Sequence, residues 1–314
     1  MNSTLKYIIV IVSGICCWKT FLGPPSELKP RSLGDPLELL IVKGQDVSEE
    51  SYNVLLDGLL VDIGPAPQIE NTLSISSIKQ DDFKGILKRH QNICLFYKGE
   101  DFSISRQNNM FAEDQEVSII VFGSTNDLKD NIDKIRGLEE GIRETEQARL
   151  VKNFSKNSNT STQNLVYKHH DIKLTLPSDI FVAHSADGCT WLRRETPKLS
   201  QGIIVLNSLN AGEKKTTEIV KMIDKILKQI VEGPIEGSYM ATEKQAPLVE
   251  SKQTIGKQTC RRIQSLWKIE NDFMGGIYVA YVLPDHIIYT YLFAPNQKKS
   301  IYINQLEAIV KTLI

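Results

Sequence analysis

Three carboxylates in the second half of the chain lie in segments that have the composition of tight loops. Glu236 and Glu243 flank a six-residue segment, and Asp272 shortly precedes the double glycine Gly275–Gly276. Two carboxyl groups held about 5 to 9 Å apart can act as acid and base in the hydrolysis of a glycoside. Sequence spacing does not fix such a distance, and a double glycine is equally typical of a β-bulge. Glu236, Glu243 and Asp272 are therefore candidate catalytic residues for a hydrolase, an alternative to a binding role.

A second group of residues combines an indole ring with two guanidinium groups and a carboxylate: Trp191, Arg193, Arg194 and Glu195. Alternate residues of a strand share a face, so Trp191 and Arg193 lie together and Arg194 lies on the other side. The planar guanidinium group matches carboxylates and phosphates. These four residues are the candidate binding site for an anionic ligand or a partner protein. The alternative is an internal Arg–Glu pair that shields the sheet, with Trp191 in the core.

An aromatic row near the C-terminus has two interpretations. Tyr289, Tyr291 and Phe293 alternate along one predicted strand and therefore share a face. Such a row can stack on glycans or peptides, or it can pack beneath the closing helix. The core interpretation is favoured because sheets commonly bury one aromatic face.

Metal and cofactor motifs are weak in this sequence. His169 and His170 are adjacent, and neighbouring strand residues point to opposite faces, so the pair is poorly placed to chelate one ion. The surroundings of Ser238 lack the G-x-S-x-G elbow, and Gly137–Gly141 lacks the Lys and Ser/Thr of a phosphate loop. We expect no metal and no cofactor.

The elements that position these residues alternate between strand-like and helix-like patterns. The chain has 314 residues, of which 41% are hydrophobic and 24% charged, enough for two domains with their own cores. We predict an α+β fold of two domains, each a mainly antiparallel sheet covered by helices, over residues 36–155 and 165–314. Residues 156–164 contain no apolar side chain and are predicted to be a linker. A formal net charge of −1 provides no basic field for nucleic acid.

The N-terminal segment has the pattern of an export signal. Lys6 precedes an uncharged apolar run that ends at Trp18, and a spanning helix needs about 20 such residues. We predict a signal peptide or lipid-anchor segment over residues 1–18, followed by a tether rich in Pro, Gly and Ser over residues 19–35. The alternative is a buried strand.

Two cysteines end the apolar run. Cys17 is the better candidate for lipid attachment because a small residue precedes it, and Cys16 is the alternative. A conventional cleavage after Gly14 also remains open. Cys94, Cys189 and Cys260 then remain in the folded part, an odd number that is not a disulfide scaffold, although Cys189 and Cys260 could pair in an oxidising compartment.

Several long motifs resemble a known family. They are WLRRETPKLSQGI (191–203), GPIEGSYMATE (233–243), LWKIENDFMGGIYVAY (266–281), APNQKKSIYINQLEAIV (294–310), KPRSLGDPLELLIV (29–42) and RHQNICL (89–95). The chain resembles a family of uncharacterised predicted lipoproteins of Bacteroidota, a domain of unknown function. The resemblance implies a lipid-anchored protein of the cell envelope and implies no activity.

The expected function follows from the resemblance and from the lack of an assembled catalytic motif. We expect an envelope lipoprotein that faces the periplasm from either membrane and acts as a binding or interaction module. Its expected partners are the membrane, through the N-terminal lipid, and another envelope protein.

Overall fold

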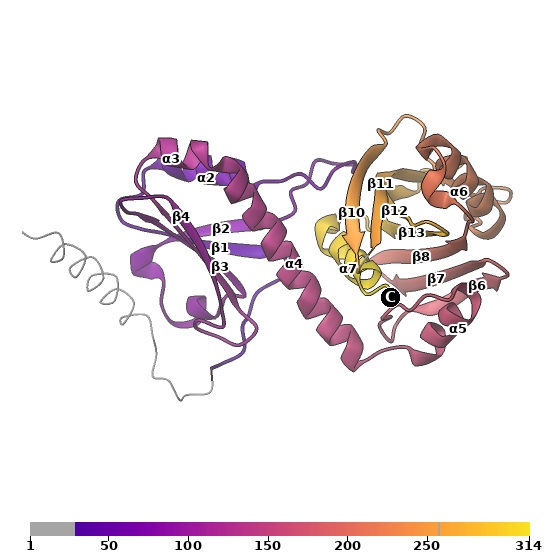
Figure 1. Cartoon of the computed structure of the whole chain (residues 1–314), viewed down its shortest axis with the longest axis horizontal. Coiled ribbons are helices and arrows are strands. Elements are labelled where there is room, and N and C mark those ends of the chain that lie inside the picture. Colours follow the sequence, from indigo (N-terminus) through magenta and orange to yellow (C-terminus); the bar gives the residue numbers. More distant parts are fainter. Residues whose placement is uncertain (1–28, 257) are drawn as a thin grey trace, which may run out of the picture. The chain divides into compact units, whose positions relative to one another are not determined.

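The computed structural model describes residues 29–256 and 258–314. Within this range the chain forms two compact units (Figure 1). Of the described residues, the first unit contains 29–59 together with Ser74–Leu138, and the second contains Leu60–Leu73 and Glu139–Ile314. The predicted signal segment, most of the predicted tether, Cys16 and Cys17 lie outside the described residues. No helix among the described residues is long and apolar enough to cross a membrane.

The first unit contains a five-stranded sheet in the order β2-β1-β3-β5-β4. Its strands are β1 (Glu38–Lys43), β2 (Ser74–Lys79), β3 (Asn92–Lys98), β4 (Ser103–Asn108) and β5 (Glu116–Phe122). Its helices are α2 (Glu49–Leu59), α3 (Thr125–Asp130) and the start of α4 (Ile132–Lys156), with 3₁₀ turns η1 (Gln80–Asp82) and η2 (Gly85–Arg89).

This sheet differs from the mainly antiparallel one expected for the first domain. β1 pairs in parallel with β2 and β3, and β3 pairs in parallel with β5, so that only β4 runs antiparallel to its neighbour. The reason is the connection through α2, because parallel neighbours need a crossover and a helix commonly provides it. The side chain of Ser48 caps the start of α2, where it accepts a hydrogen bond from the amide of Ser51 at 3.2 Å.

The second unit contains an eight-stranded antiparallel sheet, as predicted. Its order is β10-β11-β12-β13-β8-β7-β6, and β9 pairs with β11. The strands are β6 (Phe181–Ala186), β7 (Cys189–Thr196), β8 (Leu199–Asn207), β9 (Met240–Thr242), β10 (Val249–Ile255), β11 (Gln258–Ile269), β12 (Gly275–Val282) and β13 (His286–Phe293). The helices are α5 (Thr160–His170), η3 (Ala211–Glu213), α6 (Thr216–Ile230) and α7 (Lys299–Lys311). The α+β class and the two-domain organisation are confirmed.

Helices cover both faces of the second sheet (Figure 1). Tyr289 and Tyr291 of β13 pack on the α6 face, whereas Ile288 and Leu292 pack on the α7 face. The aromatic row is therefore core, but it lies under α6 and not under the closing helix. Cys189 and Cys260 belong to the cores on opposite faces, and Cys94, Cys189 and Cys260 are all free thiols.

The predicted linker is largely ordered secondary structure. α4 continues to Lys156 and α5 begins at Thr160, so only three residues separate them. The side chain of Asn159 accepts a hydrogen bond from the amide of Thr162 at 3.1 Å and thereby caps α5. Several polar residues of this segment lie in the first turn of α5. The two compact units divide between Leu138 and Glu139, which is before the predicted linker.

Candidate functional site

Two cavities of more than 400 Å³ lie in the described part of the second unit, and each is lined by residues of this unit alone. One has a volume of about 410 Å³ and lies where β7 turns into β8 and where β11 and β13 end. We call it the aromatic groove. The other has a volume of about 490 Å³ and is lined by residues 61–63 and 72, α4, β10, β11 and α7. We call it the polar cavity.

Three aromatic side chains form the floor of the aromatic groove. The indole N–H of Trp191 donates to the hydroxyl of Tyr291 at 3.1 Å, and the ring of Trp267 meets Tyr291 edge-on at 5.7 Å between centroids. Burial raises the pKa of Tyr291 to about 12, so its hydroxyl stays protonated at neutral pH. Gly202 makes room for this ring, because a Cβ there would lie 1.9 Å from Tyr291. The floor is therefore rigid and apolar.

The predicted binding residues divide between this groove and the other face of the sheet. Arg193 stacks over Trp191 with 4.9 Å between its guanidinium carbon and the ring centroid, and it pairs with Glu195. The carboxylate of Glu195 also accepts a hydrogen bond from the hydroxyl of Ser200 at 2.9 Å. Arg194 points to the opposite face and pairs with Asp179 at 2.7 Å. Trp191, Arg193 and Glu195 line the groove, and Arg194 does not.

Exposed apolar side chains flank the aromatic groove. Phe273 is fully exposed in the β11–β12 turn, beside the lining residue Met274. Ile235 is 53% exposed in the loop that follows α6, beside the lining residue Pro234. A hydrogen bond from the amide of Glu270 to the carbonyl of Tyr239 joins these two loops. Exposed apolar groups next to an aromatic floor are typical of a protein interaction site.

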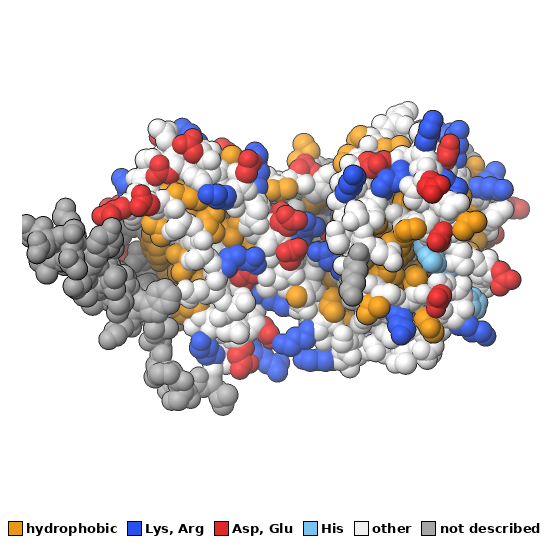
Figure 2. All heavy atoms as spheres, viewed as in Figure 1, with side chains coloured by type: hydrophobic (Ala, Val, Ile, Leu, Met, Phe, Trp, Pro, Cys, Tyr) orange, Lys and Arg blue, Asp and Glu red, His pale blue; other side chains and the backbone are white. Residues whose placement is uncertain are grey.

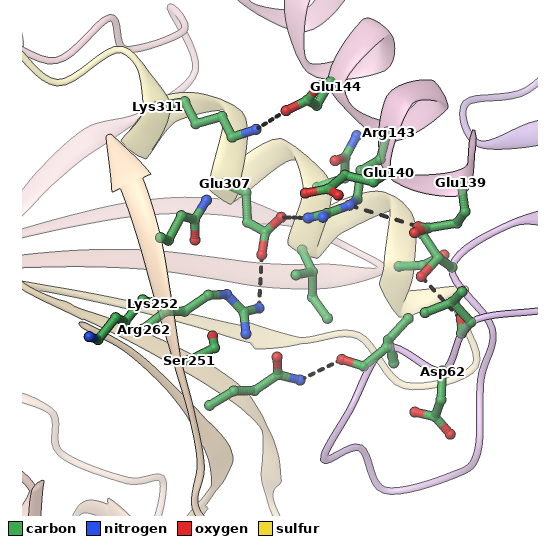
Figure 3. Close-up of a pocket in the computed structure, with 18 of the residues that line it drawn as sticks. Asp62, Glu139, Glu140, Arg143, Glu144, Ser251, Lys252, Arg262, Glu307 and Lys311 are labelled. Atoms are coloured by element: carbon green, nitrogen blue, oxygen red, sulfur yellow. Dashed lines mark hydrogen bonds and ion pairs between the residues drawn. The ribbon is translucent and has the colours of Figure 1, made fainter. Parts of the chain in front are cut away.

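The polar cavity is organised around a buried carboxylate. Glu307 of α7 accepts hydrogen bonds from Arg143 at 2.9 Å and from Arg262 at 2.8 Å, and Figure 3 shows it pointing at both guanidinium groups. Burial by itself raises the pKa of Glu307, but the attraction of Arg262 and Arg143 outweighs burial and the pKa is lowered. Glu307 is therefore ionised and fixed in position.

A second carboxyl group of the polar cavity has a pKa that is raised instead of lowered. Glu139 of α4 is 5% exposed, and burial raises its pKa despite the guanidinium group of Arg143 at 3.8 Å. Glu139 and Glu307 therefore line one cavity with their pKa values moved apart. Environments of this kind are common at functional sites, although structural ion pairs produce them too.

The segment 60–73 belongs to this cavity through hydrogen bonds to the sheet and to α7. The side-chain amide of Gln264 donates to the carbonyl of Ile63 at 2.8 Å. The carboxylate of Glu70 accepts from the amides of Lys299 and Ser300, the first residues of α7. A carboxylate at a helix N-terminus is favourable because it pairs with free amides and with the helix dipole.

The candidate catalytic carboxylates lie in three turns or loops, and none of the three residues lines either cavity. Glu236 lies in the loop after α6, and Asp272 in the β11–β12 turn caps its own turn through the amide of Phe273. Glu243 pairs with Lys268 at 3.6 Å, and its pKa is lowered by a hydrogen bond from the amide of Gln245.

The histidine pair ends a helix instead of starting a strand. The ring of His170 is buried and is bonded to Asn207 and Thr190 at 2.5 and 2.8 Å. Burial lowers the pKa of His170, so the ring is neutral at pH 7. Residues 29–256 and 258–314 contain no cluster of three or more His, Cys, Asp or Glu arranged to hold a metal ion.

Comparison with protein families divides the chain into two matched regions. Two domains of unknown function cover it. Residues 32–163 match the first, DUF8532, and residues 159–312 match the second, DUF4837. The DUF4837 region contains the whole aromatic groove, whereas the polar cavity takes Glu139 and Arg143 from the DUF8532 region and Arg262 and Glu307 from the DUF4837 region. No curated protein matches the chain.

Proposed function

We propose that this protein is a lipoprotein of the cell envelope whose second unit binds another envelope protein through the aromatic groove. The observation that carries the proposal is the joint presence of Trp191, Tyr291 and Arg193 at one cavity. Trp, Tyr and Arg are the residue types that most often dominate the binding energy of protein interfaces. The export pattern and the resemblance to predicted lipoproteins support the envelope location.

The groove selects the chemistry of the partner segment. Its floor accepts an apolar side chain, and the exposed Phe273 and Ile235 extend this apolar surface beyond the groove. The Nε of Arg193 is a buried donor without a hydrogen-bond partner among the described residues, so it can donate to a carbonyl or carboxylate of the partner. The expected partner segment is therefore an exposed stretch of protein with an apolar side chain next to an acceptor group.

The proposal does not extend to hydrolysis. Glu236, Glu243 and Asp272 line neither cavity, and Glu243 pairs with Lys268 whereas Asp272 accepts from the amide of Phe273. No specific observation favours them over the groove residues.

Photo-crosslinking in cells tests the proposal. A photo-reactive amino acid is placed in the full chain at position 273 or 235, and the matched control is position 209. Leu209 is 76% exposed and follows the C-terminal end of β8, whereas the groove lies at the start of that strand. Nine strand residues separate the two places by about 30 Å. We expect one and the same envelope protein to crosslink from positions 273 and 235 and not from position 209.

Binding of that crosslinked protein, once purified, provides the quantitative measurement. Phe273→Asp combined with Ile235→Asp should weaken binding about tenfold or more, as for loss of an interface hot spot. Leu209→Asp should leave it unchanged. Equal crosslinking from all three positions, or equal binding by the double variant and the parent chain, contradicts the proposal.

A further inference from the structure

The wall of the polar cavity contains buried polar atoms that have no hydrogen-bond partner among the described residues. They are the side-chain amide nitrogen of Asn304, the hydroxyl of Ser300, and one side-chain oxygen each of Glu139 and Gln253. Asn304 and Ser300 are only 2% and 3% exposed, and both line the cavity. A buried polar group without a partner costs about 1–3 kcal/mol. Four such atoms from three elements line this one cavity, and a ligand that fills it can supply their partners.

These atoms include both donors and acceptors. The Asn304 amide nitrogen can only donate, the Gln253 oxygen can only accept, and the Ser300 hydroxyl can do both. A ligand that satisfies them must itself donate and accept at closely spaced positions. Sugar hydroxyl groups have this property, since each is one donor and an acceptor.

The charges of the cavity balance and therefore disfavour an ionic ligand. Its lining contains five acidic and four basic side chains. The buried charges are matched two to two, because Arg143 and Arg262 both pair with Glu307 and Arg143 also lies 3.8 Å from the carboxylate of Glu139 (Figure 3). Lys311 pairs with Glu144 at 3.8 Å. In the buried part of the cavity, every charged side chain therefore already has a partner of opposite charge, and none is left to pair with a charged ligand.

We propose that the polar cavity is a binding site for a neutral saccharide of one or two sugar residues. A volume of about 490 Å³ lies in the range of small-molecule sites. The Arg143–Glu307–Arg262 group holds α4, β11 and α7 in place, and Gln147 supports it by donating to both Asn304 and Glu307. The side chains that face the ligand are therefore positioned before it binds.

Calorimetric titration of the full chain in detergent tests this site. The probes are maltose, lactose and N,N′-diacetylchitobiose, and the charged comparators are glucosamine, glucuronate and glycylglycine. We expect at least one neutral disaccharide to bind with a stoichiometry of one and the comparators not to bind. Ser300→Ala should weaken binding about fivefold, the loss expected for one hydrogen bond. Because the Ser300 hydroxyl has no partner among the described residues, the thermal stability of this variant should be unchanged or higher.

A second variant and a matched control complete the design. Gln253→Ala removes another lining acceptor from a partly exposed position of β10 and should also weaken binding. Ser118→Ala removes a buried hydroxyl that likewise lacks a partner but belongs to β5 of the first unit, and it should leave binding unchanged. Failure of all three disaccharides to bind, tighter binding of a comparator, or equal weakening by Ser118→Ala overturns the proposal. None of these outcomes bears on the aromatic groove, which shares no lining residue with the polar cavity.

Discussion

At the scale of single residues, Glu307 is the group on which the polar cavity depends most. It is 4% exposed and pairs with both Arg143 and Arg262. Glu307→Gln removes the carboxylate that the two guanidinium groups share, which should lower the free energy of unfolding at pH 7 by about 3–5 kcal/mol. Urea denaturation of the variant and the parent chain measures this.

The pH dependence of that loss has a defined sign. The pKa of Glu307 is lowered in the folded protein, so its ionised form stabilises the fold above the pKa of the unfolded chain. This stability is lost as the pH falls through the lowered folded pKa. The difference between parent and variant should therefore narrow below about pH 4. If the difference in free energy of unfolding between the parent chain and the variant stayed constant with pH, the loss would come from altered packing around Gln and not from the missing charge.

Glu139 should respond in the opposite direction. Burial raises its pKa, so the folded protein is less stable wherever this carboxyl group is ionised. Glu139→Gln keeps the shape and removes the ionisation. We expect a higher Tm than the parent chain at pH 8 and a gap that closes as the pH falls through the raised pKa. A lower Tm at pH 8 would show that attraction to Arg143 dominates at this site.

Sequence patterns predicted some of the site residues and could not predict others. The alternation of a strand was enough to place Trp191 and Arg193 on one face and Arg194 on the other. The polar cavity takes its charges from positions as distant as Glu139, Arg262 and Glu307, and no local pattern joins them. One signal was present, because Glu307 interrupts an apolar run in the closing helix. Its partners depend on tertiary packing.

At the scale of elements, the connection between α4 and α5 is ordered, because the start of α5 is capped. Asn159 caps this helix and also donates from its side chain to the carbonyl of Ile180 at 2.7 Å. Asn159→Ala should lower the free energy of unfolding by about 1 kcal/mol, the usual effect of losing an N-cap. Asn157→Ala, an exposed asparagine in the same segment, is the control and should change it by less than about 0.5 kcal/mol. If both substitutions changed the free energy of unfolding by a negligible amount, the cap at Asn159 would not stabilise this connection.

The positions of helices and strands were easier to predict than strand direction. The first half presents a strand, a helix and another strand in order, and this order favours a parallel pair. β1 and β2 are such a pair. Other features have local causes: residues 80–89 form two separate 3₁₀ turns, and Gly85, the first residue of the second turn, has a φ of +58°. Composition can indicate that a segment is helical, but a single residue with a positive φ prevents it from forming one continuous α-helix.

At the scale of the whole molecule, acidic and basic side chains are interspersed on the face shown in Figure 2. This agrees with the net charge of −1 and with the absence of a basic field in the composition. The proposed association with a membrane therefore relies on a lipid and not on surface charge, since polybasic attraction needs clustered Lys and Arg. The proposed anchor is accordingly covalent, at Cys17.

Metabolic labelling with radioactive palmitate tests the anchor. The full chain should incorporate label and sediment with membranes, and Cys17→Ser should lose the label and move to the soluble fraction. Cys16→Ser is the matched control and should behave as the parent chain. Because one acyl chain binds a membrane only marginally, retention after a carbonate wash would further indicate several chains on the N-terminus. Label that persists when both cysteines are replaced, or a parent chain that takes up none, would remove the lipid from the proposed function and leave the aromatic groove to be tested separately.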